Sequence, residues 1–332
     1  MSIRNKLLEV QDLSVSFRSP DATVTAVAGV SFHVHTGETL GIVGESGCGK
    51  SVTSLAIMRL LPQATARTEG KIVFAGQELL QLTEEKMVQM RGNQISMIFQ
   101  EPMTSLNPVY TIGKQIDEAL LLHRNISAKE ARAVTLEMLK KVNIPRAEAI
   151  SKEYPYQLSG GMRQRVMIAM ALACGPKMLI ADEPTTALDV TIQAQILDLM
   201  RQMRRETGAS IMMITHDLGV IAEMCERVIV MYAGQIVEEA ETVTLFANPQ
   251  HPYTSGLMAS IPQYDKQVLR LVPIPGQVPS PANMPAGCRF APRCSFAVTQ
   301  CLTANPPLRR IDTGHYCRCW LRGKEGEGSD PR

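Results

Sequence analysis

Residues 44–51 constrain what this chain can fold into more than any other stretch. They read Gly-Glu-Ser-Gly-Cys-Gly-Lys-Ser and fit the pattern G-x-x-x-x-G-K-[ST]. The apolar run 39–43 before them predicts a strand, and a helical pattern runs from Lys50 to about Leu61 and ends before Pro62. A glycine-rich turn between a strand and a helix N-terminus can surround phosphate oxygens with backbone N–H groups. The sequence therefore predicts a phosphate-binding loop.

The residue types in this loop also predict which atoms meet the nucleotide. The Lys50 ammonium is expected to reach the β- and γ-phosphates, and the Ser51 hydroxyl is expected to bind Mg²⁺. The residues predicted to contact the phosphates of ATP are Gly44, Ser46, Gly47, Gly49, Lys50, Ser51 and Val52.

Strand and helix patterns alternate around this loop. The chain has 332 residues, 45% of them hydrophobic, which is enough for one large domain with an appendage. Such alternation predicts a parallel sheet flanked by helices, and without an internal repeat it provides one nucleotide-binding unit. Strands are predicted at residues 7–10, 14–17, 30–34, 39–43, 72–74, 178–181, 210–215 and 227–232, and helices at 50–61, within 107–174 and at 192–205.

Two carboxylates follow the apolar run 178–181. Asp182 is placed to hold Mg²⁺ through its water shell, and Glu183 is placed to orient and deprotonate the attacking water. A strand that merely stops at a charged turn would look the same, but the phosphate-binding loop elsewhere in the chain favours the catalytic interpretation.

A second anion site is predicted at Leu-Ser-Gly-Gly-Met, residues 158–162. Ser159 can cap a helix that begins with Gly160 and Gly161, so that its hydroxyl and the free N–H groups face an anion. One molecule has no use for two γ-phosphate sites far apart in sequence. A head-to-tail dimer would use both, because the Ser159 turn of one subunit would close over ATP held by the other.

These motifs, in this order, resemble those of the ATP-binding cassette (ABC) family over residues 7 to about 262. By that resemblance Phe17 stacks on adenine, Gln100 senses Mg²⁺ and the permease, Asp189 belongs to the D-loop 187–189, and His216 contacts the γ-phosphate. The resemblance implies a RecA-like core of the P-loop NTPase type with an antiparallel β subdomain and a helical subdomain at about 107–174. It also implies ATP hydrolysis. Asp189 could equally cap the helix that follows it.

Residues 100–108 and 251–257 resemble the ATPases of dipeptide, oligopeptide, glutathione and nickel importers. That resemblance implies two membrane permease subunits, contacted near residues 103–108, a second identical or homologous ATPase, and, indirectly, an extracytoplasmic solute-binding protein. Residues 103–108 could instead be a proline-bounded surface loop. The solute cannot be read from this chain, and export or a non-transport ABC function are the competing hypotheses.

Proline becomes frequent from about Asn248, so regular structure is expected to thin out there. We place a domain boundary near residue 262 and expect 263–332 to form a small Pro/Cys-rich domain. Five of the eight cysteines, Cys288, Cys294, Cys301, Cys317 and Cys319, fall in this stretch. Clustered thiols in a segment with little core indicate a metal, either zinc or an iron–sulfur cluster, or unliganded thiols. The importer ATPases carry this pattern with a [4Fe–4S] cluster, which implies Cys319 as the fourth ligand in preference to Cys317.

The rest of the chain limits its location and partners. No apolar run approaches the roughly 18 to 20 residues that span a bilayer, and the N-terminus has no signal-peptide pattern. A net charge of +2 does not call for nucleic acid. We therefore expect a peripheral protein on the cytoplasmic face of the bacterial inner membrane, with no nucleic-acid partner.

Overall fold

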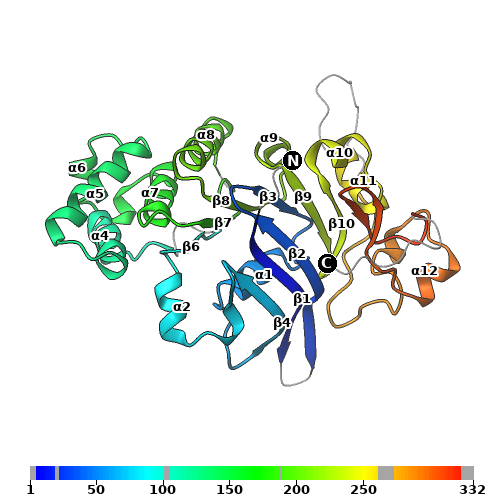
Figure 1. Cartoon of the computed structure of the whole chain (residues 1–332). Coiled ribbons are helices and arrows are strands. Elements are labelled where there is room, and N and C mark those ends of the chain that lie inside the picture. Colours follow the sequence, from blue (N-terminus) through cyan, green and yellow to red (C-terminus); the bar gives the residue numbers. More distant parts are fainter. Residues whose placement is uncertain (1–4, 19–21, 101–104, 187, 261–272, 323–332) are drawn as a thin grey trace. The chain divides into compact units, whose positions relative to one another are not determined.

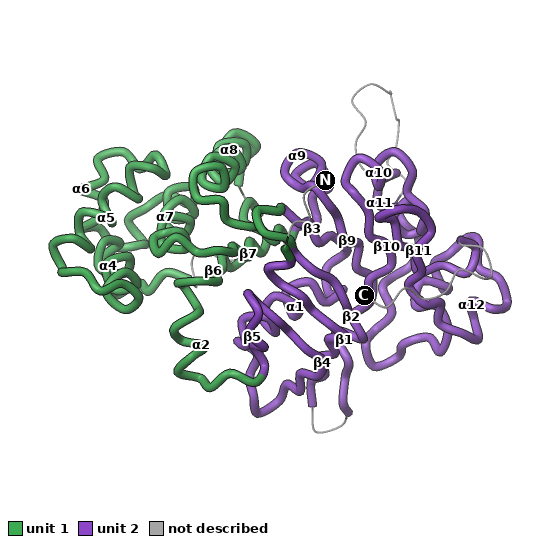
Figure 2. The backbone as a smooth tube through the Cα atoms, in the orientation of Figure 1, with its two compact units in different colours: residues 1–5, 35–38, 81–214 green, residues 6–34, 39–80, 215–332 purple. Residues whose placement is uncertain are grey.

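The computed structural model describes residues 5–18, 22–100, 105–186, 188–260 and 273–322. The chain folds as two compact units (Figure 2). Unit 1 contains His35–Glu38 and Gln81–Ile214, and unit 2 contains Lys6–Val34, Thr39–Leu80 and the chain from residue 215 onward.

Unit 1 contains a parallel sheet of three short strands in the order β6-β7-β8. Every residue of these strands is buried, which is why they read as continuous apolar runs in the sequence. The strands are β6 (Ile95–Ile98), β7 (Met178–Asp182) and β8 (Ser210–Ile214). The helices are α2 (Glu84–Met90), α4 (Ile112–His123), α5 (Ala128–Lys141), α6 (Ala147–Ile150), α7 (Gly160–Leu172) and α8 (Val190–Thr207), with a 3₁₀ turn at Pro155–Gln157.

The predicted helical stretch 107–174 is confirmed as α4 to α7, in which α4, α5 and α7 pack against one another (Figure 1). A capping box starts α5: the Ser127 hydroxyl accepts from the Glu130 N–H, and the Glu130 carboxylate accepts from the Ser127 N–H. Helix α7 also packs against β6. The helical part of unit 1 is thereby joined to its sheet.

Unit 2 contains a four-stranded sheet in the order β2-β1-β4-β5, antiparallel between β1, β4 and β5. The two short strands predicted at 7–10 and 14–17 are one strand, with a register shift between Gln11 and Ser14 where Asp12 has φ 47°. This bulge breaks the alternation of side chains, which is why the sequence read as two runs. The strands are β1 (Lys6–Arg18), β2 (Thr23–His35), β4 (Ala66–Phe74) and β5 (Gln77–Glu78).

The remaining strands of unit 2 pair in the order β11-β12-β10-β9-β3. The β3–β9 pair is parallel and the other pairs are antiparallel. The strands are β3 (Thr39–Val43), β9 (Arg227–Tyr232), β10 (Gln235–Glu241), β11 (Arg309–Asp312) and β12 (His315–Cys317). The helices are α1 (Lys50–Ile57), α9 (Leu218–Met224), α10 (Thr242–Ala247), α11 (Pro252–Ala259) and α12 (Thr299–Thr303), with 3₁₀ turns at Leu79–Gln81 and Ala291–Arg293.

The expectation that regular structure thins out after Asn248 was partly wrong. Helix α11 begins with Pro252 at its first position, where proline is tolerated, and β12 adds to the edge of β10. Buried hydrogen bonds hold this edge: Glu238 of β10 accepts from the N–H groups of Gln250 and His251 and lies 2.7 Å from Nε2 of His315. The predicted domain boundary near residue 262 lies outside the described residues. No helix in the described ranges is long and apolar enough to cross a membrane.

Candidate functional site

The predicted phosphate-binding loop joins β3 to α1 in unit 2. Its tip, Ser46 and Gly47, is exposed, and α1 begins after Gly49 without a side-chain cap, so the helix N-terminus can receive an anion. Ser51 and Val52 lie half-buried in that turn. This is the strand–turn–helix setting that phosphate binding requires.

Two positions of the loop need glycine. Gly44 has φ 152°, and a Cβ there would overlap the Met231 carbonyl. Gly49 has φ 102°, and its Cβ would lie 2.9 Å from the Ala26 carbonyl oxygen. The loop therefore adopts a backbone that other residues would distort.

The Lys50 ammonium lies over the loop itself. It is buried and donates to the carbonyls of Gly44 at 2.7 Å and Glu45 at 3.1 Å, and it lies 3.7 Å from the Cys48 sulfur. Burial raises the pKa of the Cys48 thiol, so this cysteine stays protonated at neutral pH. Lys50 can exchange these carbonyls for phosphate oxygens.

Two residues from the C-terminal part of the chain bond the loop at Glu45, and the sequence analysis did not predict either contact. The Tyr253 hydroxyl accepts from the Glu45 N–H at 2.8 Å, and Arg293 forms an ion pair with the Glu45 carboxylate at 2.6 Å. Tyr253 lies in the stretch 251–257 that resembles peptide-importer ATPases, but no local pattern pairs either residue with the loop.

Phe17 and His216 also lie in unit 2. Phe17 is half-buried near the end of β1, opposite Ala66 of β4. His216 is exposed between Thr215, whose N–H reaches the Ile42 carbonyl of β3 at 3.3 Å, and the N-cap of α9. His216 therefore follows a residue bonded to the strand that leads into the loop.

Unit 1 brings together Gln100 and Glu183. The Gln100 side-chain amide donates to the Glu183 carboxylate at 3.0 Å, and the Thr186 hydroxyl donates to the same oxygen at 2.9 Å. Glu183 has φ 49°, an uncommon backbone for a residue other than glycine, and its N–H bonds the Ile214 carbonyl at 2.8 Å. Asp182 is buried at the end of β7. The carboxylate predicted to act as a base is thus fixed in orientation, at a site with backbone strain.

The predicted second anion site also lies in unit 1. Ser159 is exposed at the N-cap of α7 and accepts from the Met162 N–H, as the sequence predicted. Gly160 is exposed, and a Cβ on Gly161 would lie 3.1 Å from Ile192 of α8. Asp189 caps α8 by accepting from the Ile192 N–H at 2.9 Å, while Ala187 of the predicted D-loop lies outside the described residues.

Four of the C-terminal cysteines line one small cavity in unit 2: Cys288, Cys294, Cys301 and Cys319. Its other walls include Phe290 and Trp320. Cys317 does not line it but is buried in β12.

Burial raises the pKa of the Cys288, Cys294 and Cys319 thiols, so any cation would have to displace their protons. Within the described part of the chain, no group of three or more His, Cys, Asp or Glu side chains is arranged so that it could hold a metal ion. The predicted metal site therefore remains a prediction.

Solved structures share this fold. The dimeric ATP-binding cassette MJ0796, in a post-hydrolysis state bound to ADP and Pi, matches with a TM-score of 0.64 and 28% identity, covering 71% of this chain and 98% of that one. CbiO1 from Clostridium perfringens, part of the transporter complex cbiONQ, matches with a TM-score of 0.62 and 26% identity, covering 74% of this chain and 92% of that one. The fold and the motifs define an ATP-binding cassette ATPase.

Sequence comparisons narrow the class. The ABC transporter family matches residues 27–186, and the oligopeptide/dipeptide transporter C-terminal region matches residues 237–301. The oligopeptide transport ATP-binding protein AppD of Bacillus subtilis is 54% identical over 96% of this chain and 98% of its own length. The dipeptide transport ATP-binding protein DppD of the same organism is 51% identical over 97% of this chain and 96% of its own. The chain belongs to the ABC transporter family, among the ATP-binding subunits of its oligopeptide and dipeptide transporters.

Proposed function

We propose that this chain hydrolyses ATP to energise the uptake of di- or oligopeptides across the cytoplasmic membrane. The observation that carries the proposal is the loop 44–51, in which the uncapped N-terminus of α1 and the buried Lys50 ammonium form a preset phosphate site. The names of AppD and DppD support peptides as the solute class. Nickel, glutathione or another solute is the alternative.

The catalytic roles follow from the residue chemistry. Glu183 accepts the proton of the attacking water, Gln100 holds the Glu183 carboxylate in orientation, and His216 binds the γ-phosphate. Phe17 stacks on the adenine. Hard oxygen donors suit Mg²⁺, so the Ser51 hydroxyl, the Asp182 carboxylate and the Gln100 amide oxygen would hold the ion, which would neutralise phosphate charge when bound.

The active form is a head-to-tail dimer with an identical or homologous ATPase. The exposed Ser159 at the N-terminus of α7 supports this, because a helix N-terminus aimed at solvent can receive a phosphate held by a second cassette. The related MJ0796 cassette forms a dimer. Two permease subunits would dock near residues 103–108, of which 103 and 104 lie outside the described residues. The extracytoplasmic solute-binding protein would act through the permeases, and the chain would sit on the cytoplasmic face.

The chain from residue 263 onward forms an appended Pro/Cys-rich domain that binds a [4Fe–4S] cluster. The four cysteines that line one cavity with aromatic walls support this, because cysteine sulfurs are the donor set of such clusters. Binding would require these thiols to lose their protons and to close around the cluster, since the described side chains form no ready metal-holding group. Zinc is the alternative occupant. Anaerobically purified protein should contain iron and sulfide and absorb visible light. The Cys301→Ser variant should lose the iron, the sulfide and the absorption. A colourless, iron-free wild-type protein would exclude the cluster.

The solute is tested with the whole transporter. ATP hydrolysis would be measured for the chain assembled with its permease and binding protein, in the presence of dipeptides, longer peptides, glutathione or nickel. We expect stimulation by one peptide class. Stimulation by nickel or glutathione alone would replace the peptide assignment, and no stimulation despite basal hydrolysis would point to export or another solute.

A further inference from the structure

The ion pair between Glu45 and Arg293 joins the phosphate-binding loop to the cysteine-rich segment. Both terminal nitrogens of Arg293 bond the Glu45 carboxylate, at 2.6 and 3.0 Å. The Arg293 side chain is only 4% exposed, whereas that of Glu45 is 31% exposed. A buried guanidinium requires a counterion, so the position of Glu45 is tied to that of Arg293.

Arg293 is itself held from several sides. It donates to the carbonyls of Pro275 at 2.9 Å and Ile274 at 3.3 Å, and its guanidinium lies 5.7 Å from the centre of the Tyr232 ring. The hydrogen bonds with Glu45 raise the pKa of Arg293 above its ordinary value, despite the opposing effect of burial. The position of the Arg293 guanidinium is therefore fixed in the absence of a ligand.

Glu45 transmits this restraint to the residue that meets the phosphates. Its carbonyl accepts from the Lys50 ammonium at 3.1 Å and from the Cys48 N–H at 3.3 Å, and its N–H bonds Tyr253. The side chain, carbonyl and N–H of Glu45 are thus all held. Moving the carboxylate would shift the carbonyl on which Lys50 rests.

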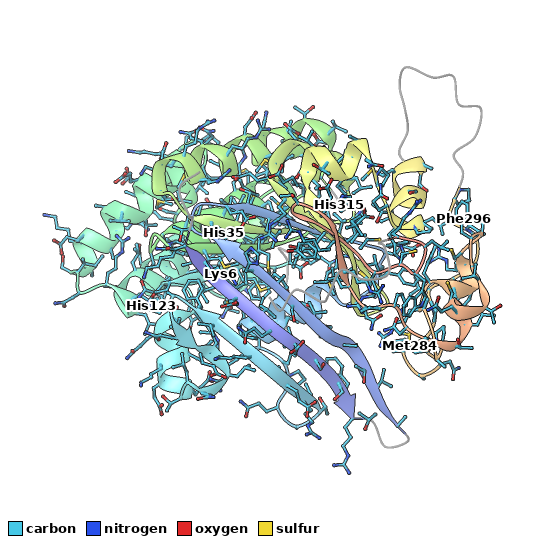
Figure 3. All side chains as sticks on the ribbon, turned by 45° about the vertical axis from the view of Figure 1, so that its right-hand side comes forward. Lys6, His35, His123, Met284, Phe296 and His315 are labelled. Atoms are coloured by element: carbon cyan, nitrogen blue, oxygen red, sulfur yellow. The ribbon has the colours of Figure 1, made fainter. Side chains whose placement is uncertain are left out.

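A single side chain, Phe290, separates the cysteine cavity from the tyrosines that contact Arg293 and Glu45. Phe290, one of its walls, packs against Tyr232 with ring centres 5.2 Å apart and against Tyr253 at 5.5 Å. Cys294 follows Arg293 directly in the chain. Figure 3 shows Phe296, another wall residue, within this same C-terminal part of the molecule.

We propose that Arg293 is a positioning residue for the phosphate-binding loop, through which the cysteine-rich segment sets the affinity for ATP. The inference rests on the proposed binding of ATP at residues 44–51. Its effect is expected on the nucleotide dissociation constant and KM, with kcat preserved, because Arg293 bonds the loop through Glu45 and not through the groups assigned to the hydrolytic step.

The test compares Arg293→Gln, Arg293→Lys and Arg318→Gln in the full-length protein, using a fluorescent ATP analogue, steady-state hydrolysis and thermal melting. Arg318 is a matched control, because this arginine of the same segment donates to the backbone carbonyls of Ile236 and Pro306. We expect Arg293→Gln to raise the dissociation constant about tenfold, or about 1.4 kcal/mol. Arg293→Lys should restore part of the lost affinity. Arg318→Gln should leave the dissociation constant unchanged.

Glu45→Gln tests the pair from its more exposed side, where folding should tolerate the change. It should raise the dissociation constant as Arg293→Gln does. The double variant should bind the ATP analogue no more weakly than either single variant. An unchanged dissociation constant in Arg293→Gln, an equal increase in Arg318→Gln, or a fall in kcat alone would overturn the proposal. Failure of the wild-type protein to bind the analogue would instead refute the proposed ATP function.

Discussion

The phosphate-binding loop has two sides that are built in different ways. The side facing the phosphates consists of consecutive residues, 44–51, whose glycines and helix start are set by local geometry. The side behind it is closed by Arg293, 248 positions from Glu45 along the chain, and by Tyr253. The first side resembles that of any protein with this motif, whereas the second is specific to a chain that carries the C-terminal segment. The comparison shows that contacts within eight consecutive residues shape one side of the loop, whereas contacts with distant parts of the chain hold the other.

The largest effect is expected at Glu183, the carboxylate assigned to the hydrolytic step. Glu183→Gln keeps the hydrogen-bonding shape but removes the base, so kcat for ATP hydrolysis should fall by roughly 10²- to 10⁴-fold with ATP binding retained. Glu206→Gln, an exposed glutamate at the end of α8, is the matched control. Hydrolysis by Glu183→Gln at the wild-type rate would show that another group accepts the proton.

The next largest effect is on the pH dependence of the unfolding free energy, and it is expected at His251, close to Tyr253 on the side of the loop held by distant residues. Burial lowers its pKa to about 4 from 6.5, and its Nδ1 accepts from the Tyr253 N–H, so the folded state requires the neutral ring. Between these pKa values the unfolded chain binds the proton more readily. The contribution of His251 to the unfolding free energy is therefore fully present above about pH 6.5. About 3 kcal/mol of it is lost as the pH falls towards 4.

Urea unfolding of the wild-type protein and of His251→Asn at pH 7 and pH 5 checks this. The variant should lose less stability between the two pH values than the wild type does. Glu238 does not account for this slope, because its hydrogen bonds with His315 and with the N–H groups of Gln250 and His251 outweigh its burial and hold its pKa below 4.5. Its contribution is lost only at lower pH. Equal slopes in the two proteins would rule out His251 as the titrating group.

The same contrast explains what the sequence could predict. Ser159 and Asp189 were correctly expected to cap helices, because each cap involves residues within three positions. The hairpin β11–β12 and the Arg293 contact were missed, because they depend on which distant segments pack together. The cysteines are intermediate: their clustering was visible, but the placement of Cys319 on the cavity and Cys317 in a strand follows from the pairing of β12 with β10.

A smaller effect is expected at Gln164, which joins two local elements of unit 1. Its buried side-chain amide donates from α7 to the Pro184 carbonyl at 2.6 Å, directly after Glu183. Gln164→Ala leaves that carbonyl without this donor and should cost about 1 to 3 kcal/mol of unfolding free energy. The exposed Gln202→Ala is the control, and equal stability of the two variants would show that the bond contributes nothing measurable.

The smallest effect is expected for a purely local feature, the capping box of α5. Ser127→Ala removes the acceptor for the Glu130 N–H, and a lost N-cap typically costs about 1 kcal/mol. Denaturant unfolding would measure this, with the exposed neighbour Lys129→Ala as the unaffected control. Because the cap lies in unit 1, outside the Arg293 and Glu45 contacts, the affinity for ATP should not change. A loss of ATP affinity in Ser127→Ala comparable to that in Arg293→Gln would mean that affinity follows overall stability, and that the restraint behind the loop has no special role.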